Sequence, residues 1–133
     1  MFTTDIRVNF SDADPAGIMF FANAYRFAHQ AYEELMESFS DPSDYFFNEK
    51  FAVPILHSES DYLRPVFPNT IIRVEITVSE IRQSSFELDY LIKNKKGEEC
   101  VKIRTVHIVV DKKDWKKIDI PDRLREFLQN NKI

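Results

Sequence analysis

The residues best suited to chemistry lie between positions 11 and 23, in the stretch Ser-Asp-Ala-Asp-Pro-Ala-Gly-Ile-Met-Phe-Phe-Ala-Asn. Pro15 biases Asp14 toward an extended backbone, and Gly17 permits a sharp turn. A carboxylate is thereby held just ahead of a predicted helix, whose unpaired N–H groups and positive dipole end stabilise developing negative charge. A nucleophile or base beside such an oxyanion site is what acyl transfer needs.

The same stretch also has a purely structural interpretation. Aspartate is a favoured helix cap and turn residue, so Asp12 or Asp14 could serve only in that way. The helix is predicted to begin near Phe20, six residues beyond Asp14, which is too far for ordinary capping. This spacing favours a chemical role for Asp14.

The element that follows this stretch is predicted to be one long helix ending at Phe39. Its apolar residues recur at the three-and-four spacing of a helical stripe: Phe21, Ala24, Tyr25, Ala28, Tyr32, Leu35, Met36 and Phe39. Phe20, Phe27 and Ala31 widen the apolar arc. We therefore expect the helix to be buried on most of its circumference.

After a loop from 40 to 50, the apolar pattern changes to a period of two, which indicates strands with one face on a core. Strands are predicted at 3–10, 53–63, 72–79, 85–93 and 100–110, with a short helix starting at Pro121. Short links between the last strands favour antiparallel pairing. The predicted fold class is α+β, a single domain over 1–133 in which an antiparallel sheet wraps around one long central helix.

Composition excludes several other classes. The 133 residues are 44% hydrophobic, which suits one core, and the formal charge of -4 with a pI near 5.4 gives no global attraction to nucleic acid or an anionic membrane. The single Cys100 cannot form an intramolecular disulfide, and neither a signal peptide nor a long apolar run is apparent. We expect a cytoplasmic protein with no membrane or nucleic-acid partner.

The stretch Asp-Ala-Asp-Pro-Ala-Gly-Ile-Met-Phe-Phe-Ala-Asn resembles the active-site loop of the 4-hydroxybenzoyl-CoA thioesterase family. Asp-Tyr-Leu-Arg-Pro at 61–65 and Ser-Ser-Phe at 84–86 resemble its later landmarks. The resemblance implies a hotdog fold, Asp14 as the catalytic carboxylate, and the Phe21 backbone N–H as the group that polarises the thioester carbonyl. It also implies homodimers, often paired into tetramers, with active sites at the dimer interface.

Within this family, His29–Glu33 and Phe51–His57 look closest to the 1,4-dihydroxy-2-naphthoyl-CoA thioesterases. Ala24 departs from the pattern, because a tyrosine is common there, and this puts the shape of the acyl pocket in question. The basic turn that contacts CoA phosphates in the family corresponds to 82–84, where only Arg82 is cationic. The predicted substrate-binding residues are Gly17, Phe20, His57, Arg82 and Ser84.

Several side chains have alternative interpretations. His57 could line the acyl pocket or be a structural histidine, and the aromatic residues 45–47 could form a lid or pack at a subunit contact. The lysines of 112–117, near Trp115, suggest a solvated turn. Cys100 is expected to be a small buried hydrophobe rather than a nucleophile.

The predicted reaction is hydrolysis of an acyl-CoA thioester, with an aryl group such as 4-hydroxybenzoyl or 1,4-dihydroxy-2-naphthoyl, or a short acyl chain. Asp14 would act as nucleophile or as base on a water. No metal is expected, because the histidines lack i, i+4 spacing, and no cofactor is expected, because CoA is part of the substrate. The alternatives are a non-catalytic acyl-CoA binding module and, less favoured because no histidine lies near Asp14, a hotdog dehydratase.

Overall fold

The structure is a computed structural model that describes residues 1–39 and 45–132. Part of the predicted 40–50 loop lies outside these residues. The elements, in chain order, are β1 (Phe2–Val8), the 3-10 helix η1 (Phe10–Asp12), α1 (Asn23–Phe39), β2 (Phe51–Ala52), β3 (Ile55–Tyr62), β4 (Thr70–Ile81), β5 (Ser85–Lys93), β6 (Glu99–Ile108), β7 (Val110–Asp111) and α3 (Asp122–Asn130).

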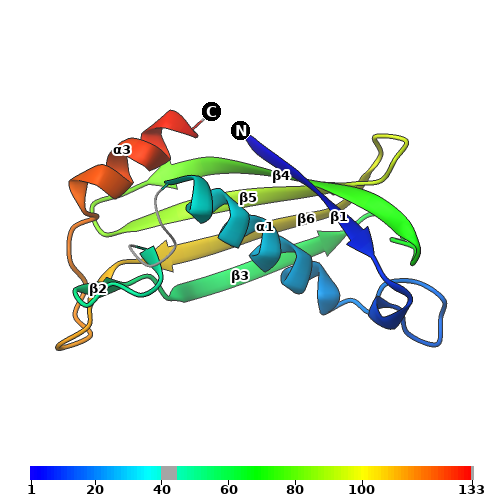
Figure 1. Cartoon of the computed structure of the whole chain (residues 1–133), viewed down its shortest axis with the longest axis horizontal. Coiled ribbons are helices and arrows are strands. Elements are labelled where there is room, and N and C mark those ends of the chain that lie inside the picture. The colour runs from blue at the N-terminus through cyan, green and yellow to red at the C-terminus, as the bar shows by residue number, and fades with distance from the viewer. Residues whose placement is uncertain (40–44, 133) are drawn as a thin grey trace.

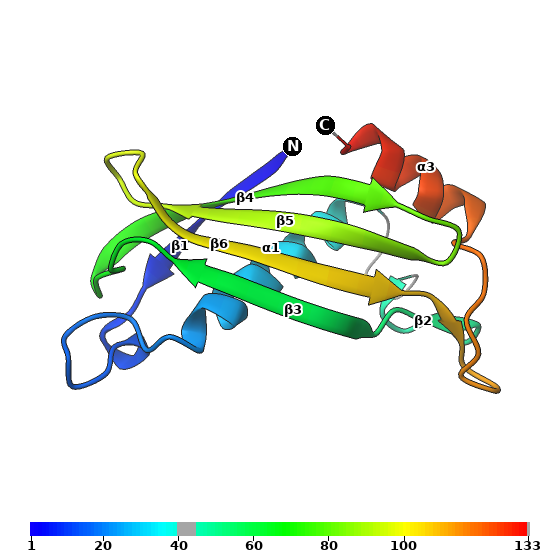
Figure 2. The ribbon, with the colours of Figure 1, turned by 180° about the vertical axis from the view of Figure 1, so that it is seen from behind.

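Five of the strands form one sheet in the order β1-β4-β5-β6-β3, and every neighbouring pair is antiparallel. Figure 1 shows α1 lying across one face of this sheet, and Figure 2 shows the opposite face uncovered by any helix. The predicted α+β class and the hotdog arrangement, a sheet curved around one long helix, are confirmed.

The core lies between α1 and the sheet. Along β4 and β5 alternate residues are buried, as the period-two pattern predicts, and these side chains meet Phe27, Leu35 and Met36 of α1. The expectation that α1 is buried on most of its circumference is wrong for this chain. Arg26, Gln30 and other polar residues face solvent because the sheet covers only one side of the helix.

Several predicted boundaries also change. β1 ends at Val8, because Phe10 begins η1, and α1 begins at Asn23 rather than near Phe20. Residues 20–22 instead form a tight turn, in which the Asn23 N–H donates to the Phe20 carbonyl at 2.9 Å. The short pair of strands β2 and β7 was not expected from the sequence.

The strands run between two ends of the molecule. The end that holds residues 9–22, the close of β3 and the β5–β6 turn is called here the loop end. The end that holds the β4–β5 turn at 82–84, the β2–β7 pair and the start of α3 is called the α3 end. Figure 1 shows these regions at opposite ends of the strands, and the candidate site lies at the loop end.

Candidate active site

The loop that carries Asp14 is a short antiparallel hairpin. The Asp14 N–H donates to the Ile18 carbonyl at 3.0 Å, the Phe20 N–H donates to the Asp12 carbonyl at 2.9 Å, and Ala13 forms a bridge with Met19. Gly17 occupies the turn with a φ of 81°, a conformation that glycine adopts without a steric penalty. This ladder folds Asp14 back along the chain segment that enters α1.

The carboxylate of Asp14 is half-buried. Its Oδ1 accepts the Ala16 N–H at 2.8 Å, which makes Asp14 the first residue of an Asx turn. The structural interpretation of Asp14 is thus correct for one oxygen, although the residue caps no helix. Its Oδ2 accepts no hydrogen bond from any residue of 1–39 or 45–132. One carboxylate oxygen is therefore available to a substrate or a water.

The start of α1 offers two unpaired backbone donors. Carbonyl groups of Phe20, Phe21 and Ala22 accept the N–H groups of residues three positions later, at 2.9, 3.3 and 3.2 Å. Because the peptide unit is planar and trans, the N–H of Phe21 points away from the Phe20 carbonyl and out of the helix start. Across the part of the chain that the structure describes, neither the Phe21 N–H nor the Ala22 N–H has a protein acceptor. The pair is a candidate site for an oxyanion.

The donor on Ala22 was not predicted from the sequence. The sequence could have indicated it, because the first few N–H groups of any helix have no partner within that helix. Tyr62 was also missed. Its hydroxyl donates to the Phe21 carbonyl at 2.8 Å, and its ring meets the Phe21 ring edge-on with centroids 6.5 Å apart. No local pattern could reveal a contact between residues 41 positions apart.

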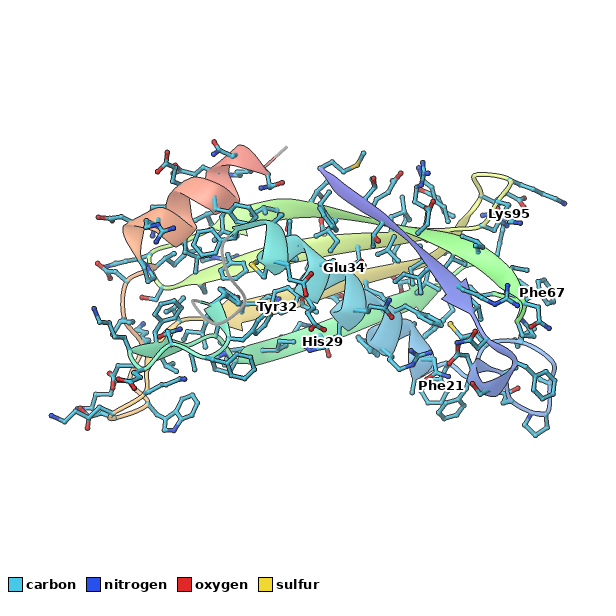
Figure 3. The ribbon with its side chains drawn as sticks, viewed as in Figure 1. Phe21, His29, Tyr32, Glu34, Phe67 and Lys95 are labelled. Carbon is cyan, nitrogen blue, oxygen red and sulfur yellow. The ribbon has the colours of Figure 1, made fainter. Side chains whose placement is uncertain are left out.

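Aromatic rings surround the candidate oxyanion site. The Phe20 and Phe21 rings lie 5.0 Å apart, and Phe20, Phe21 and Tyr62 keep 43%, 62% and 46% of their surface exposed. Figure 3 shows Phe21 beside the start of α1, at the same end of the molecule as Phe67. Such exposed aromatic surface beside polar donors suits an acyl group that needs shielding from water.

The predicted substrate-binding residues separate into two groups. Gly17 and Phe20 share the loop with Asp14, as expected. Arg82 and Ser84 lie in the β4–β5 turn at the α3 end, so the structure does not bring them to Asp14 within one chain. Arg82 is held there by an ion pair, with its Nη2 2.5 Å from Oε2 of Glu87.

His57 does not line a pocket beneath α1. It pairs across the sheet with Val106, whose neighbours Thr105 and His107 are buried on the helix side, so His57 projects from the opposite face. Its Nε2 lies 3.4 Å from Oε1 of Glu59 on the same exposed face. Within a single chain the register of β3 directs this side chain away from α1, and its role in substrate binding stays a prediction.

Two further ionisable side chains, those of His107 and Cys100, are fully buried. His107 stacks on Phe86 with ring centroids 4.9 Å apart, and its Nε2 lies 2.7 Å from the Thr105 hydroxyl. Burial, with a smaller contribution from His29, lowers the pKa of His107 to about 3, so the ring is neutral near pH 7. Burial raises the pKa of the Cys100 thiol, which agrees with its expected role as a hydrophobe.

The aromatic residues that follow the undescribed segment are partly core residues. Tyr45 is buried and its hydroxyl hydrogen bonds to that of Tyr32, and burial raises the pKa of both phenols. For Tyr45 this supports packing rather than a lid. Phe47 is 77% exposed. Among the described residues no three carboxylate, histidine or cysteine side chains gather as a metal ion would require. No helix within those residues is long and apolar enough to cross a membrane.

Comparison with known proteins adds independent information. Residues 8–128 match the model of the thioesterase-like superfamily. The chain is 34% identical to a 1,4-dihydroxy-2-naphthoyl-CoA hydrolase of Nostoc punctiforme, over 98% of this chain and 88% of the relative. It is 32% identical to the protein of that name from Thermosynechococcus vestitus, over 92% and 85%.

Solved structures share the fold. The 1,4-dihydroxy-2-naphthoyl-CoA thioesterase of Synechocystis superposes with a TM-score of 0.90 at 23% identity, covering 97% of this chain and 96% of that one. A gentisyl-coenzyme A thioesterase superposes with a TM-score of 0.84 at 20% identity, covering 96% and 99%. At these identities the superpositions establish the architecture alone.

Proposed function

The chain belongs to the thioesterase-like superfamily, and from that premise we propose that it hydrolyses the thioester of an aryl-CoA, with 1,4-dihydroxy-2-naphthoyl-CoA as the first candidate substrate. The observation that carries the proposal is that the loop ahead of α1 holds both a free Asp14 oxygen and, a few residues later, the unpaired N–H groups of Phe21 and Ala22. The names of the relatives support the choice of a hydroxylated aromatic acyl group.

Asp14 and the two backbone N–H groups have separate roles in the proposed hydrolysis. The thioester carbonyl oxygen would accept hydrogen bonds from the Phe21 and Ala22 N–H groups, which stabilise the charge that develops on it. Asp14 would attack the carbonyl carbon, so that the C–S bond breaks, CoA thiolate leaves, and water hydrolyses the resulting anhydride. Alternatively, Asp14 would take a proton from a water that attacks directly. Both routes yield the free acid and CoA.

The site would be completed by a second copy of the chain. β3 is an edge strand with an open side, and it exposes Ile55 and Leu56, 45% and 63% of whose surfaces are accessible. Unpaired edges of this kind favour pairing with another chain. Figure 1 shows β3 running from the α3 end to the loop end. Two β3 strands paired antiparallel about a two-fold axis would therefore set the α3 end of one subunit beside the loop end of the other.

This arrangement would supply the cations that the loop end needs for CoA. Arg82 of the partner subunit would approach the Asp14 loop, together with the turn at 111–117. In that turn Lys113, Lys116 and Lys117 form no ion pair with any described residue. Their charges suit the phosphates of CoA. The proposed enzyme is thus at least a homodimer, with pairing of dimers as a further step.

The test is a thiol-release assay with three substrates: 1,4-dihydroxy-2-naphthoyl-CoA, 4-hydroxybenzoyl-CoA and a straight-chain acyl-CoA. We expect the aryl thioesters to be cleaved with higher kcat/KM than the aliphatic one. Trp115, the only tryptophan, lies in the turn at 111–117 that is proposed to meet CoA, so its fluorescence would report CoA binding without turnover. If all three substrates bind without thiol release, the protein is a non-catalytic acyl-CoA binding module rather than an enzyme.

Asp14→Asn is the matched variant for this assay. The amide keeps an oxygen for the Ala16 N–H, so the Asx turn is preserved while the nucleophile or base is lost. We expect kcat to fall by about 10³-fold or more with little change in melting temperature. Wild-type turnover in this variant would exclude Asp14 as the catalytic group.

A further inference from the structure

Asp12 is a buried charge at the centre of the loop end. Only 6% of its surface is exposed. Its Oδ2 accepts the Asn9 N–H at 2.8 Å, and its Oδ1 is paired with the Arg26 guanidinium on the first turn of α1. Buried carboxylates are costly unless paired in this way. The side chain therefore ties the end of β1 to the body of α1.

The backbone of Asp12 makes a second set of connections. Its carbonyl oxygen accepts both the Phe20 N–H at 2.9 Å and the Asn23 side-chain amide at 2.8 Å. The first of these bonds pairs the Phe20 N–H. Phe21 is therefore the first residue ahead of α1 whose N–H is unpaired among the described residues. One residue thus determines both where the hairpin closes and which N–H groups are left for an oxyanion.

We propose that Asp12 is a positioning residue, which sets the orientation of the Phe21 N–H relative to Asp14 through Arg26 and Asn23. This inference rests on the proposed thioesterase function. Asp12 itself would not touch the reacting atoms, because all five of its hydrogen-bonding contacts are made within the protein and its carboxylate is shielded from solvent.

The hairpin explains why loss of the Asp12 contacts would lower turnover rather than weaken substrate binding. Asp14 lies two residues after Asp12 on one arm of the hairpin, and Phe21 follows Phe20 on the other. A shift of Asp12 would change the separation of the two catalytic groups, while the aromatic surface of Phe20 and Tyr62 would persist. Small displacements of this kind weaken transition-state contacts more than substrate binding.

The experiment compares Asp12→Asn, Arg26→Gln and the double variant in the thiol-release assay. We expect Asp12→Asn to lower kcat about 10²-fold while KM changes less than about threefold. The double variant should be more active than Asp12→Asn, since it leaves no unpaired guanidinium beside the amide. Asp5→Asn is the control, because it removes an exposed aspartate that pairs with Arg73 at 3.0 Å on the sheet, and its kcat should match wild type.

A readout that needs no catalysis separates this inference from the proposed function. Hydrogen exchange followed by mass spectrometry should show faster exchange over residues 13–22 in Asp12→Asn, with β5 unchanged. If wild type cleaves no thioester, the proposed function fails, whereas faster exchange over 13–22 would still show that Asp12 holds this loop in place. Wild-type kcat and wild-type exchange in a folded Asp12→Asn would overturn the inference.

Asn23→Ala serves if Asp12→Asn does not fold. It removes the amide donor to the Asp12 carbonyl without touching the ion pair. A fall in kcat of about tenfold at unchanged KM supports the positioning role, and unchanged kcat contradicts it.

Discussion

The hydroxyl of Tyr62, at the end of β3, donates a hydrogen bond of 2.8 Å to the carbonyl oxygen of Phe21. That carbonyl belongs to the peptide whose N–H is on Ala22, and it also accepts the Ala24 N–H at 3.3 Å. The edge strand and the candidate oxyanion site are therefore one connected unit. If the proposed dimer pairs through β3, contact between subunits would therefore act on the orientation of the Ala22 N–H through Tyr62.

Tyr62→Phe should lower kcat by about 3-fold to 10-fold. The variant loses a hydrogen bond, with a net contribution of about 1 kcal/mol, that orients the peptide carrying the Ala22 N–H. Steady-state kinetics with an aryl-CoA would measure it. Tyr25→Phe is the matched control, since the Tyr25 hydroxyl also joins α1 to β3, at 3.1 Å from the Ser60 hydroxyl, without touching that peptide. Equal losses in the two variants would argue against a specific role for Tyr62.

Replacing Phe21 tests the backbone donor directly. Phe21→Pro removes the N–H, and we expect kcat to fall about 10²-fold, the usual effect of losing one oxyanion donor. Phe21 is the second residue of the turn closed by the Asn23 N–H and the Phe20 carbonyl, a position that suits proline, and thermal melting would show that the variant folds. Phe21→Ala removes the ring but keeps the N–H, so its effect should fall mainly on KM. A proline variant that is as active as the alanine variant would contradict the assignment.

Leu56→Lys tests the proposed dimer. A lysine on the open edge of β3 opposes strand pairing between subunits, so light scattering should show a shift from dimer to monomer, with activity falling in parallel. Ile71→Lys provides the control, because Ile71 is an exposed apolar residue, at 40%, on β4, which is not an edge strand. A Leu56→Lys protein that is monomeric and fully active would show that one chain contains the whole site.

The buried His107 should make the free energy of unfolding depend on pH. Its pKa is lowered from an unfolded value near 6.5 to about 3 in the folded chain, so the unfolded chain binds a proton that the folded chain does not. The free energy of unfolding is therefore highest above pH 6.5 and falls on acidification toward pH 3, by at most about 1.4 kcal/mol per pH unit. Urea titrations between pH 7 and 4.5 would measure the slope.

His107→Gln should reduce that slope, even though it also lowers stability at pH 7 through the loss of stacking on Phe86. If the slope in His107→Gln equals that of wild type, another group is responsible for the acid sensitivity.

Local sequence information was sufficient for much of the fold. The period-two alternation of β4 and β5, the three-and-four spacing of α1, and the Asp14, Pro15, Gly17 sequence each concern residues within one element or one turn. Their conformations depend mainly on near neighbours. For that reason the α+β class, the long helix and the loop that presents a carboxylate ahead of it were predictable. The catalytic roles of Asp14 and the Phe21 N–H remain predictions until they are measured.

The sequence by itself therefore determined which elements form and which carboxylate the loop presents. Only the tertiary structure decided that Tyr62 reaches the Phe21 carbonyl, that Asp12 is buried against Arg26, and that His57 projects away from α1. It also placed the β4–β5 turn, which holds Arg82 and Ser84, at the end of the strands opposite the Asp14 loop. Strand order and register set these relationships, and they depend on pairings between distant residues that no local pattern encodes.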